Sequence, residues 1–470
     1  MNEAMNNPPF VKKFDFRGVY GKDIKDEDAF YLGLALCLVL KPKKILLGWD
    51  TRVSSKTLAL NFIQAIKNFD VEILYLDKVP IDYVTVASVT SDFDLSIMFT
   101  GSHNTWEWSG LLIHTKGGFS LQGELVEEVV KVYYDSQITP YEKPSVELST
   151  YINFQEALEK IYIEKIQNLI PLHEIKAQSV VVDIGDGSGG KALDLVEKLL
   201  PQVIFTRLND RRIYDSNTPH TADPSEPENA QQIIKHMKNK DFTSGFIYDS
   251  DADRVLAIDE RGDILNGSVL AGGMSACFKM LGISSDRIGY AVECGPSLYN
   301  AVKDVNKTVN LPISLIPIPV GRSVVRQLLF DGKIDVGVEN VGHFYIKDFF
   351  MTDSATFVML LILYWISMNG KLSGMLDKHP DGLRQQFSVP LLTNDNHLYI
   401  MSEDVSTIFK DLEMKKITVD GLRLEAYKGE YMNSWCAIRK SGYEQVEKRY
   451  YGSTDPNIFN ALGGVLLKKD

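Results

Sequence analysis

Strand-like runs that end in a polar turn recur along this chain, and this pattern restricts its possible folds most. Lys44–Asp50, Ser179–Asp183, Thr243–Asp249 and Ile288–Glu293 are mostly apolar runs that end in an acidic residue. Helix-like segments follow several of them, and one begins at Thr51–Ser55 with serines that can cap it. Alternation of strands and helices predicts α/β domains with parallel or mixed sheets.

The length and composition predict several soluble domains. A chain of 470 residues is too long for one core, so two to four domains are expected. Its 44% hydrophobic and 24% charged residues are typical of globular proteins. Pro140–Ser149 is a plausible linker. From about Leu391 the alternation stops, which predicts a small α+β unit with a helix over Glu403–Leu412 and strands around Leu422 and Trp435.

Charge, cysteines and hydropathy exclude several classes of protein. A net charge of −12 argues against a nucleic-acid binder, although an acidic chain can hold a phosphate in a locally basic pocket. The longest apolar run, Ala355–Met368, is shorter than the roughly 18 residues of a membrane span and predicts a buried helix. Cys37, Cys277, Cys294 and Cys436 are widely separated, which favours free thiols in a reducing cytoplasm.

A serine lies in a loop that follows one of the predicted strands. Asp94–Phe99 is the strand-like run, and Gly101, His103 and Asn104 flank Ser102 directly after it. Loops at strand ends are where α/β folds present reactive groups. The alternative is a polar turn without chemistry.

Three carboxylates at alternate positions give the strongest local signal. Asp249, Asp251 and Asp253 follow a strand and are separated by small residues. Such close charges repel unless a cation or Arg254 neutralises them, and oxygen ligands suit a hard ion such as Mg²⁺. An EF-hand is rejected because Arg254 stands where its turn requires glycine. The alternative is a solvated acidic turn.

Three further segments carry groups that suit a sugar phosphate. Glu339 and His343 bracket a turn, where a carboxylate can accept sugar hydroxyls and an imidazole can move a proton. Arg439, Ser441 and the backbone around Gly442 can form an anion nest. Arg17, between a strand-like segment and a glycine, is either a turn residue or a phosphate ligand.

Taken together, these loops resemble the α-D-phosphohexomutase superfamily of phosphomannomutase/phosphoglucomutase type. The resemblance covers essentially the whole chain and keeps the family's motif order. The matching segments are Asp15–Gly18, Gly48–Ser55, Thr100–Thr105, Asp249–Arg254, Val338–His343 and Arg439–Glu444.

The resemblance implies an α/β fold of four domains around a central cleft. Three would be α/β domains with mixed sheets and the fourth a smaller α+β domain. The expected boundaries are 1–148 with the phosphoserine loop, 149–264 with the metal loop, 265–385 with the sugar loop and 386–470 with the phosphate loop.

The resemblance also implies a mechanism and a set of site residues. A phosphoserine at Ser102 would exchange its phosphoryl group with a hexose phosphate through a bound hexose 1,6-bisphosphate, with Mg²⁺ as cofactor. The implied catalytic residues are Ser102, His103, Arg17, Arg254 and His343. The implied metal ligands are Ser102, Asp249, Asp251 and Asp253. The implied substrate-binding residues are Glu339, Asn340, Gly342, His343, Arg439, Ser441, Gly442 and Tyr443.

Three departures from the family pattern leave other interpretations open. Leu112 stands where the family often has a lysine, so His103 or His343, or less favourably His114 or Lys116, would move the proton. Val341 and Tyr443 replace a serine and a threonine. The leading hypothesis is an active mannose or glucose phosphate mutase; the others are a phosphoglucosamine mutase and a catalytically weak sugar-phosphate-binding paralogue. We expect a cytoplasmic monomer or homodimer that binds hexose phosphates but neither nucleic acid nor membranes.

Overall fold

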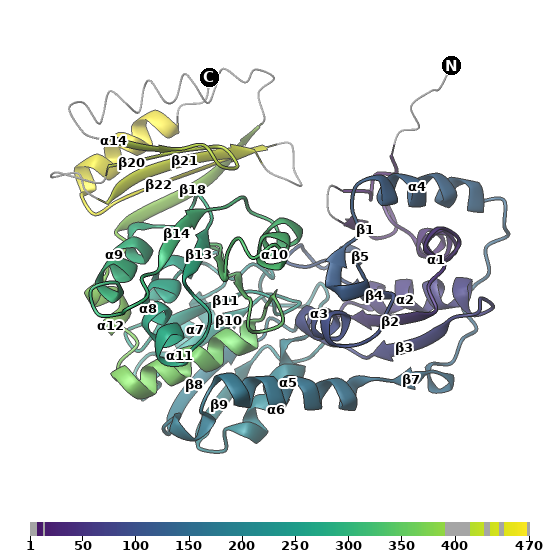
Figure 1. Ribbon diagram of the computed structural model, residues 1–470, viewed down its shortest axis with the longest axis horizontal. Helices are drawn as coiled ribbons and strands as arrows, with labels where there is room; N and C mark the ends of the chain where they lie inside the picture. The colour runs from purple at the N-terminus through teal and green to yellow at the C-terminus, as the bar shows by residue number, and fades with distance from the viewer. Residues whose placement is uncertain (1–6, 13–14, 391–413, 427–432, 441–445, 468–470) are drawn as a thin grey trace. The chain divides into compact units, whose positions relative to one another are not determined.

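The computed structural model describes residues 7–12, 15–390, 414–426, 433–440 and 446–467 (Figure 1). The chain divides into two compact units, Met1–Val255 with Thr352–Met359, and Leu256–Met351 with Leu360–Asp470. In the described ranges no helix combines the length and apolar character needed to cross a bilayer. The four cysteines are buried and free. A cytoplasmic location stays a prediction.

The first sheet has seven strands and a mixed topology, as the sequence predicts. Its order is β1-β5-β4-β2-β3-β7, with β6 paired to β5; β2 runs parallel to β3 and β4, and β5 runs antiparallel to β1 and β4. The strands are β1 (Phe16–Val19), β2 (Lys44–Trp49), β3 (Glu72–Leu76), β4 (Leu95–Phe99), β5 (Trp108–Thr115), β6 (Phe119–Ser120) and β7 (Ile152–Asn153). The helices are α1 (Asp26–Leu40), α2 (Val53–Ile66), α3 (Ile81–Thr90) and α4 (Glu124–Ser136).

Helices cover both faces of this sheet because its strands are apolar at successive positions. On one face Ile45, Leu47 and Ile97 pack with residues of α1, α2 and α4. The opposite face carries Gly48, where an added Cβ would lie 2.5 Å from Val84 of α3. Because β2 and β4 are parallel neighbours, the residues that follow them lie together at the carboxyl edge of the sheet, which is where the candidate site lies.

The second and third sheets are also mixed. Their orders are β12-β11-β10-β8-β9 and β14-β13-β15-β16-β17. The second comprises β8 (Gln178–Asp183), β9 (Val203–Leu208), β10 (Ser244–Tyr248), β11 (Val255–Asp259) and β12 (Ile264–Leu265), with nearby helices α5 (Gln155–Leu169), α6 (Gly189–Leu199) and α7 (Gln231–Met237). The third comprises β13 (Arg287–Tyr290), β14 (Ser314–Pro317), β15 (Val336–Val338), β16 (Phe344–Ile346) and β17 (Thr352–Asp353). The helices of this part of the chain include α8 (Gly267–Met280), α9 (Pro296–Val305), α10 (Arg322–Phe330) and α12 (Gly374–Lys378). The apolar run from Ala355 forms α11 (Ala355–Asn369), which is largely buried as expected.

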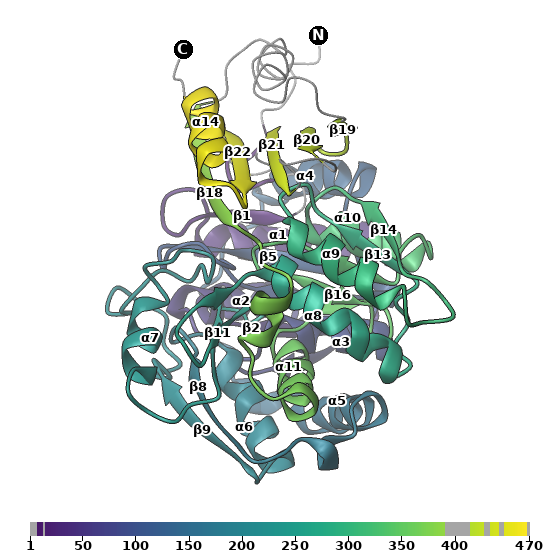
Figure 2. The ribbon, with the colours of Figure 1, turned by 90° about the vertical axis from the view of Figure 1, so that its left-hand side faces the viewer.

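The fourth sheet is antiparallel, and the described helix α14 lies on its face (Figures 1 and 2). Its order is β18-β22-β21-β20-β19. The elements are β18 (Leu383–Pro390), β19 (Met414–Ile417), β20 (Leu422–Ala426), β21 (Ser434–Lys440), β22 (Val446–Ser453) and α14 (Pro456–Leu466). Leu462 and Leu466 of α14 pack on Leu424, Ile438 and Tyr451 of the sheet. Three α/β sheets and a β-rich C-terminal part confirm the predicted fold class. The helix expected over Glu403–Leu412 lies outside the described residues.

Candidate active site

The loop after β4 holds Ser102 in a left-handed backbone conformation. The φ angle of Ser102 is 51°, and its backbone N–H donates to Thr100 Oγ1 at 2.8 Å. At the preceding Gly101, a Cβ would lie 2.6 Å from the Trp108 carbonyl oxygen, so only glycine fits there. The side chain of Ser102 is partly exposed, and its Oγ lies 3.2 Å from Nδ1 of His103. The loop therefore presents a hydroxyl with an imidazole beside it.

Arg52, which follows β2, binds the backbone of this loop from inside the protein. Its Nη2 donates to the carbonyl oxygens of Ser102 at 2.5 Å and Asn104 at 2.9 Å, and its Nη1 donates to that of Thr105 at 2.7 Å. Its Nε donates to Asp50 at 3.0 Å, and the Arg52 side chain is fully buried. A lysine has no planar fork of donors to replace these bonds. Arg52 lies in a segment that matches the family motif, but sequence reasoning did not select it as a site residue.

The acidic loop after β10 contacts the serine loop directly. Ser250 Oγ accepts from Arg52 Nη2 at 3.0 Å and donates to the Ser102 carbonyl oxygen at 2.6 Å. Thr100 Oγ1 lies within hydrogen-bond distance of carboxylate oxygens of Asp50, at 2.8 Å, and Asp251, at 3.0 Å. The serine loop and the acidic loop, which the sequence singled out separately, are thus joined by hydrogen bonds within the first unit.

Asp249, Asp251 and Asp253 are all buried, and one carboxylate oxygen from each lies within 4.8 Å of the others. Asp249 is anchored, because its Oδ1 accepts the backbone N–H groups of Asp253 and Arg254, both at 3.1 Å. Three buried carboxylates at this separation need compensating positive charge. Oxygen ligands around one point fit a hard divalent cation such as Mg²⁺.

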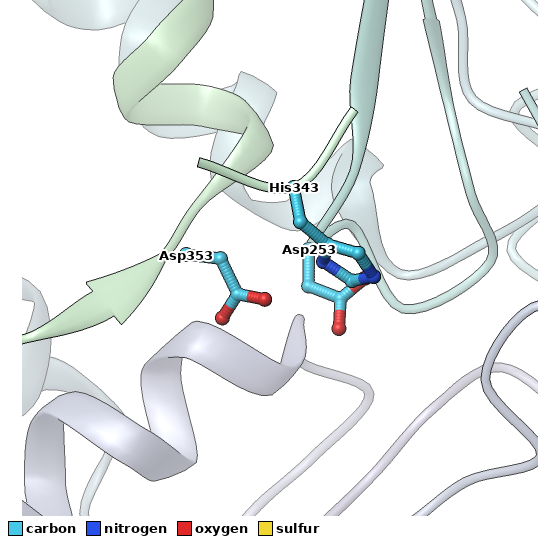
Figure 3. Close-up of side chains that lie close together, drawn as sticks. All are labelled: Asp253, His343 and Asp353. Atoms are coloured by element: carbon cyan, nitrogen blue, oxygen red, sulfur yellow. The ribbon is translucent and has the colours of Figure 1, made fainter. Parts of the chain in front are cut away.

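A fourth carboxylate lies near the acidic loop. Asp353 of β17 places a carboxylate oxygen within 4.8 Å of one from Asp253 (Figure 3). Asp353 is fully buried. Sequence reasoning missed it because β17 follows the acidic loop by about a hundred residues and belongs to no motif.

Arg254 is held by two carboxylates and keeps one nitrogen available. Its Nε donates to Asp249 at 2.9 Å and its Nη1 to Asp223 at 3.1 Å. Its Nη2 is buried and has no hydrogen-bond partner among the described residues. A buried guanidinium donor without a partner is suited to an anionic oxygen from a ligand.

Asp223, which sequence reasoning also missed, stands between two candidate catalytic groups. Burial alone would raise the pKa of its carboxyl, but the guanidinium of Arg254 and then the imidazole of His103 hold that pKa well below its usual range. Ser225 fixes the Asp223 carboxylate through its backbone N–H at 2.9 Å and its hydroxyl at 2.7 Å. Asp223 therefore remains ionised and positions Arg254.

The loop that leads to Asp223 is fastened to both neighbouring sheets. Tyr214 stacks on Arg52, with the guanidinium carbon 4.4 Å from the ring centroid. His220 Nε2 lies 3.2 Å from an oxygen of Asp183 at the end of β8. Burial opposes the charged imidazole, but the hydrogen bond and charge of Asp183 raise the pKa of His220 overall.

Arg17 and Leu112 lie on neighbouring strands of the first sheet. Arg17 of β1 forms a 2.6 Å ion pair with Asp15 and stands opposite Gly110 of β5. A Cβ on Gly110 would lie 2.1 Å from the Phe16 carbonyl oxygen, so glycine permits this close strand pairing. Leu112 is 5% exposed and pairs with Met98, which makes it a core residue. The role of Arg17 toward Ser102 stays a prediction.

The predicted sugar loop lies after β15 in the second unit. Glu339 Oε1 accepts the Gly321 N–H at 3.1 Å, and Gly342 has a φ angle of 106° that its turn requires. The His343 ring stacks on Tyr345 with centroids 5.6 Å apart. The side-chain oxygen of Asn340 accepts from Ser268 Oγ at 2.5 Å, so this predicted ligand also has a structural bond to α8.

The predicted phosphate loop is only partly described. Arg439 lies near the end of β21, with its guanidinium 5.9 Å from the Tyr450 ring centroid. Arg439 Nε is buried and has no hydrogen-bond partner among the described residues. Ser441, Gly442 and Tyr443 lie outside the described residues, so their roles stay predictions.

Comparison with known domain families identifies the class of protein. The families described as phosphoglucomutase/phosphomannomutase alpha/beta/alpha domains I, II and III match residues 10–137, 160–262 and 289–382. The chain therefore belongs to the phosphoglucomutase/phosphomannomutase family, within the α-D-phosphohexomutase superfamily. It is an enzyme of the isomerase class, an intramolecular phosphotransferase.

Individual relatives agree with this assignment. A phosphomannomutase from Methanocaldococcus jannaschii is 24% identical over 93% of this chain and 91% of its own. A phosphoglucosamine mutase from Clostridium beijerinckii is 26% identical over 84% of this chain and 87% of its own.

Solved structures share the fold. A phosphoglucomutase/phosphomannomutase family protein from Burkholderia thailandensis matches with a TM-score of 0.77 at 21% identity, over 98% of this chain and 99% of that one. An Aspergillus fumigatus N-acetylphosphoglucosamine mutase in complex with GlcNAc-6P and magnesium matches with a TM-score of 0.56 at 14% identity, over 91% of this chain and 82% of that one.

Replacing Arg52 by lysine should loosen the serine loop without unfolding the first unit. Lysine cannot hold three carbonyl oxygens and Ser250 together, so we expect amide hydrogens of residues 101–105 to exchange roughly 10- to 100-fold faster. Hydrogen exchange followed by mass spectrometry measures this. The matched control is Arg207→Lys, which removes a guanidinium from an ion-pair cluster with Asp194 and Asp210. Equal protection of the loop in Arg52→Lys and wild type would show that Arg52 does not hold it.

Proposed function

We propose that this enzyme interconverts hexose 6-phosphate and hexose 1-phosphate, with mannose or glucose as the sugar. A phosphoserine at Ser102 would be the phosphoryl carrier and a bound hexose 1,6-bisphosphate the intermediate and activator. The observation that carries the proposal is the junction of the serine and acidic loops, where Arg52 and Ser250 both bind the Ser102 carbonyl oxygen. This junction supports a single site for a phosphoryl group and a metal.

The residues around Ser102 suit phosphoryl transfer, which needs positioning and positive charge more than covalent chemistry. Nη2 of Arg254, which has no hydrogen-bond partner in the described part of the chain, would bind a phosphoryl oxygen, and Asp223 would hold the guanidinium in place. Arg17 would add positive charge. Asp249, Asp251 and Asp253, with an oxygen on Ser102, would hold Mg²⁺, which would supply charge to the transferring group.

Each half-reaction would transfer one phosphoryl group between Ser102 and a hydroxyl of the sugar. The sugar hydroxyl oxygen forms a bond to phosphorus as the bond from phosphorus to Ser102 Oγ breaks. The hydroxyl proton must leave and Oγ must regain one; His103, at 3.2 Å from Oγ, is suited to the second task, and His343 is a candidate for the first. The bisphosphate then turns around and returns its other phosphoryl group to Ser102.

The second unit would bind the part of the substrate that does not react. Glu339, Asn340, Gly342 and His343 would contact the sugar, and Arg439, Ser441, Gly442 and Tyr443 the distant phosphate. Fixing the distant phosphate would hold the reacting hydroxyl in line with Ser102.

Ser102 should carry phosphate in the active enzyme. We expect intact-mass analysis, after incubation with glucose 1,6-bisphosphate and Mg²⁺, to detect one added phosphate group in wild type and none in Ser102→Ala. Thr105→Ala, which removes another hydroxyl from the same loop, should keep the phosphate. If wild type never gains phosphate under these conditions, the proposed mutase mechanism is wrong.

Asp251→Asn should lower turnover by roughly 10²- to 10³-fold, because it removes a charge that would hold the metal. Steady-state kinetics measures this loss. We also expect Mg²⁺ to raise the thermal midpoint of wild type and to leave that of Asp251→Asn unchanged. Asp92→Asn serves as the control, since Asp92 is exposed and pairs with Lys116 at the surface. Near-normal turnover in Asp251→Asn would place the metal elsewhere.

Phosphoglucosamine mutase is the second candidate, because relatives of that name match much of the chain. We expect kcat/KM for mannose 6-phosphate or glucose 6-phosphate to exceed that for glucosamine 6-phosphate by about tenfold or more. The reverse order would favour the glucosamine enzyme. A third outcome is that the three sugar phosphates bind but are not turned over and that Ser102 is never phosphorylated. The chain would then be a sugar-phosphate-binding paralogue, and Leu112, Val341 and Tyr443 would explain its loss of activity.

A further inference from the structure

A buried carboxylate stands at the centre of the carboxyl edge of the third sheet. β13 lies between β14 and β15 and runs parallel to both. The loops that follow β14 and β15 are in contact, because the N–H of Gly321 donates to Glu339 Oε1. Glu293 follows β13 and so leaves the sheet between these two loops, at the edge where α/β sheets bind ligands.

The loop that carries Glu293 is docked on the C-terminal sheet within the same unit. Arg423 Nη1 donates to the Val292 carbonyl oxygen at 2.6 Å, and Arg384 Nη2 to that of Glu293 at 3.4 Å. Val292 packs with Trp435 and Tyr450 in one apolar cluster. The backbone of this loop is therefore fixed beside β21, the strand that carries Arg439.

The carboxylate of Glu293 is buried but not neutralised by a bonded partner. Glu293 is 2% exposed, and its Oε2 has no hydrogen-bond partner among the described residues. No ion pair joins it to Arg439 within the described ranges, yet Arg439 is its strongest opposite charge. Burial raises the pKa of the Glu293 carboxyl. The positive charges of Arg439 and Arg384 oppose this rise, and the negative charge of Glu339 adds to it. Among the described residues, Arg439 therefore acts on the Glu293 carboxylate as a nearby opposite charge and not as a bonded partner.

We propose that Glu293 sets the affinity for the substrate phosphate by weakening the hold of Arg439 on it. The loop of Glu293 packs on Tyr450, which the Arg439 guanidinium also faces. In its ionised form, Glu293 at this place offsets part of the attraction of Arg439 for a phosphate dianion. Weaker binding has a catalytic advantage, because a bisphosphate intermediate has to release one phosphate from this pocket before it can turn around. A pocket that binds the substrate and the bisphosphate equally tightly slows this reorientation. This inference rests on the proposed function for the assignment of Arg439 to the substrate phosphate.

The test is ligand binding in chains that cannot transfer a phosphoryl group. Calorimetry of glucose 6-phosphate and of glucose is performed on Ser102→Ala without divalent ions, and on the same chain with Glu293→Gln or Glu293→Met. We expect both neutral replacements to bind glucose 6-phosphate about tenfold more tightly and glucose as before. Glu293→Asp, which keeps the charge, should stay near the starting affinity. Glu260→Gln is the charge-matched control, because Glu260 bonds Ser373 elsewhere in the second unit.

Each outcome has one meaning. Unchanged affinity in both neutral variants overturns the proposal, and weaker binding of glucose as well as glucose 6-phosphate would show that Glu293 reads the sugar instead. If neither neutral variant folds, as judged by circular dichroism, Glu293 is structural and the proposal is overturned. If Arg439→Gln keeps full affinity for glucose 6-phosphate, Arg439 is not the phosphate ligand and the proposal also fails. Because phosphorylation of Ser102 is measured separately, failure here is distinguishable from failure of the mutase mechanism.

Discussion

The buried guanidinium of Arg52 joins the parts of the first unit on which the candidate chemistry depends. It binds the backbone of the serine loop, the hydroxyl of Ser250 and the carboxylate of Asp50. Burying a charge is costly unless it is paired and hydrogen-bonded, and here the planar fork of arginine uses its donors on acceptors from several segments. The left-handed backbone of Ser102 is thereby held in place. If Ser102 is the proposed phosphoryl carrier, this network would place it precisely, and positioning is most of what such a reaction needs.

Charge balance explains why the acidic loop can be buried next to that network. Asp249, Asp251 and Asp253 carry like charges at short range, and Arg254 offsets part of them through Asp249. Asp223 binds the same guanidinium through Nη1, and the third nitrogen, Nη2, has no hydrogen-bond partner among the described residues. The remaining negative charge is what a divalent cation and the positive groups around a phosphoryl oxygen would neutralise. The proposed metal site and the arginine are thus parts of one electrostatic unit.

The sequence predicted the features that depend on local order, and missed those that depend on distant contacts. Alternating apolar runs and polar turns located β2, β8, β10 and β13 within a residue or a few, and the loops with Ser102 and Asp249 follow such strands. Asp223 and Asp353 carry no local motif, because their significance comes from neighbours far along the chain. Arg52 could have been found from the Asp50-Thr-Arg52 run at a strand end. Glu293 also ends a predicted strand, but its burial beside the C-terminal sheet is visible only in the fold.

The second unit shows how the same family machinery can be adjusted through charge. Sugar and phosphate ligands there would meet two carboxylates, Glu293 and Glu339, near Arg439. A pocket of this kind binds a dianion less strongly than one lined by cations alone, so contacts to the sugar would contribute a larger share of the binding energy. Yet Val341 replaces a hydroxyl in that very turn. Discrimination depends on the difference in transition-state binding between two substrates, and the phosphate is common to all the candidate hexose phosphates. Selectivity in this chain would therefore come from the sugar contacts that remain.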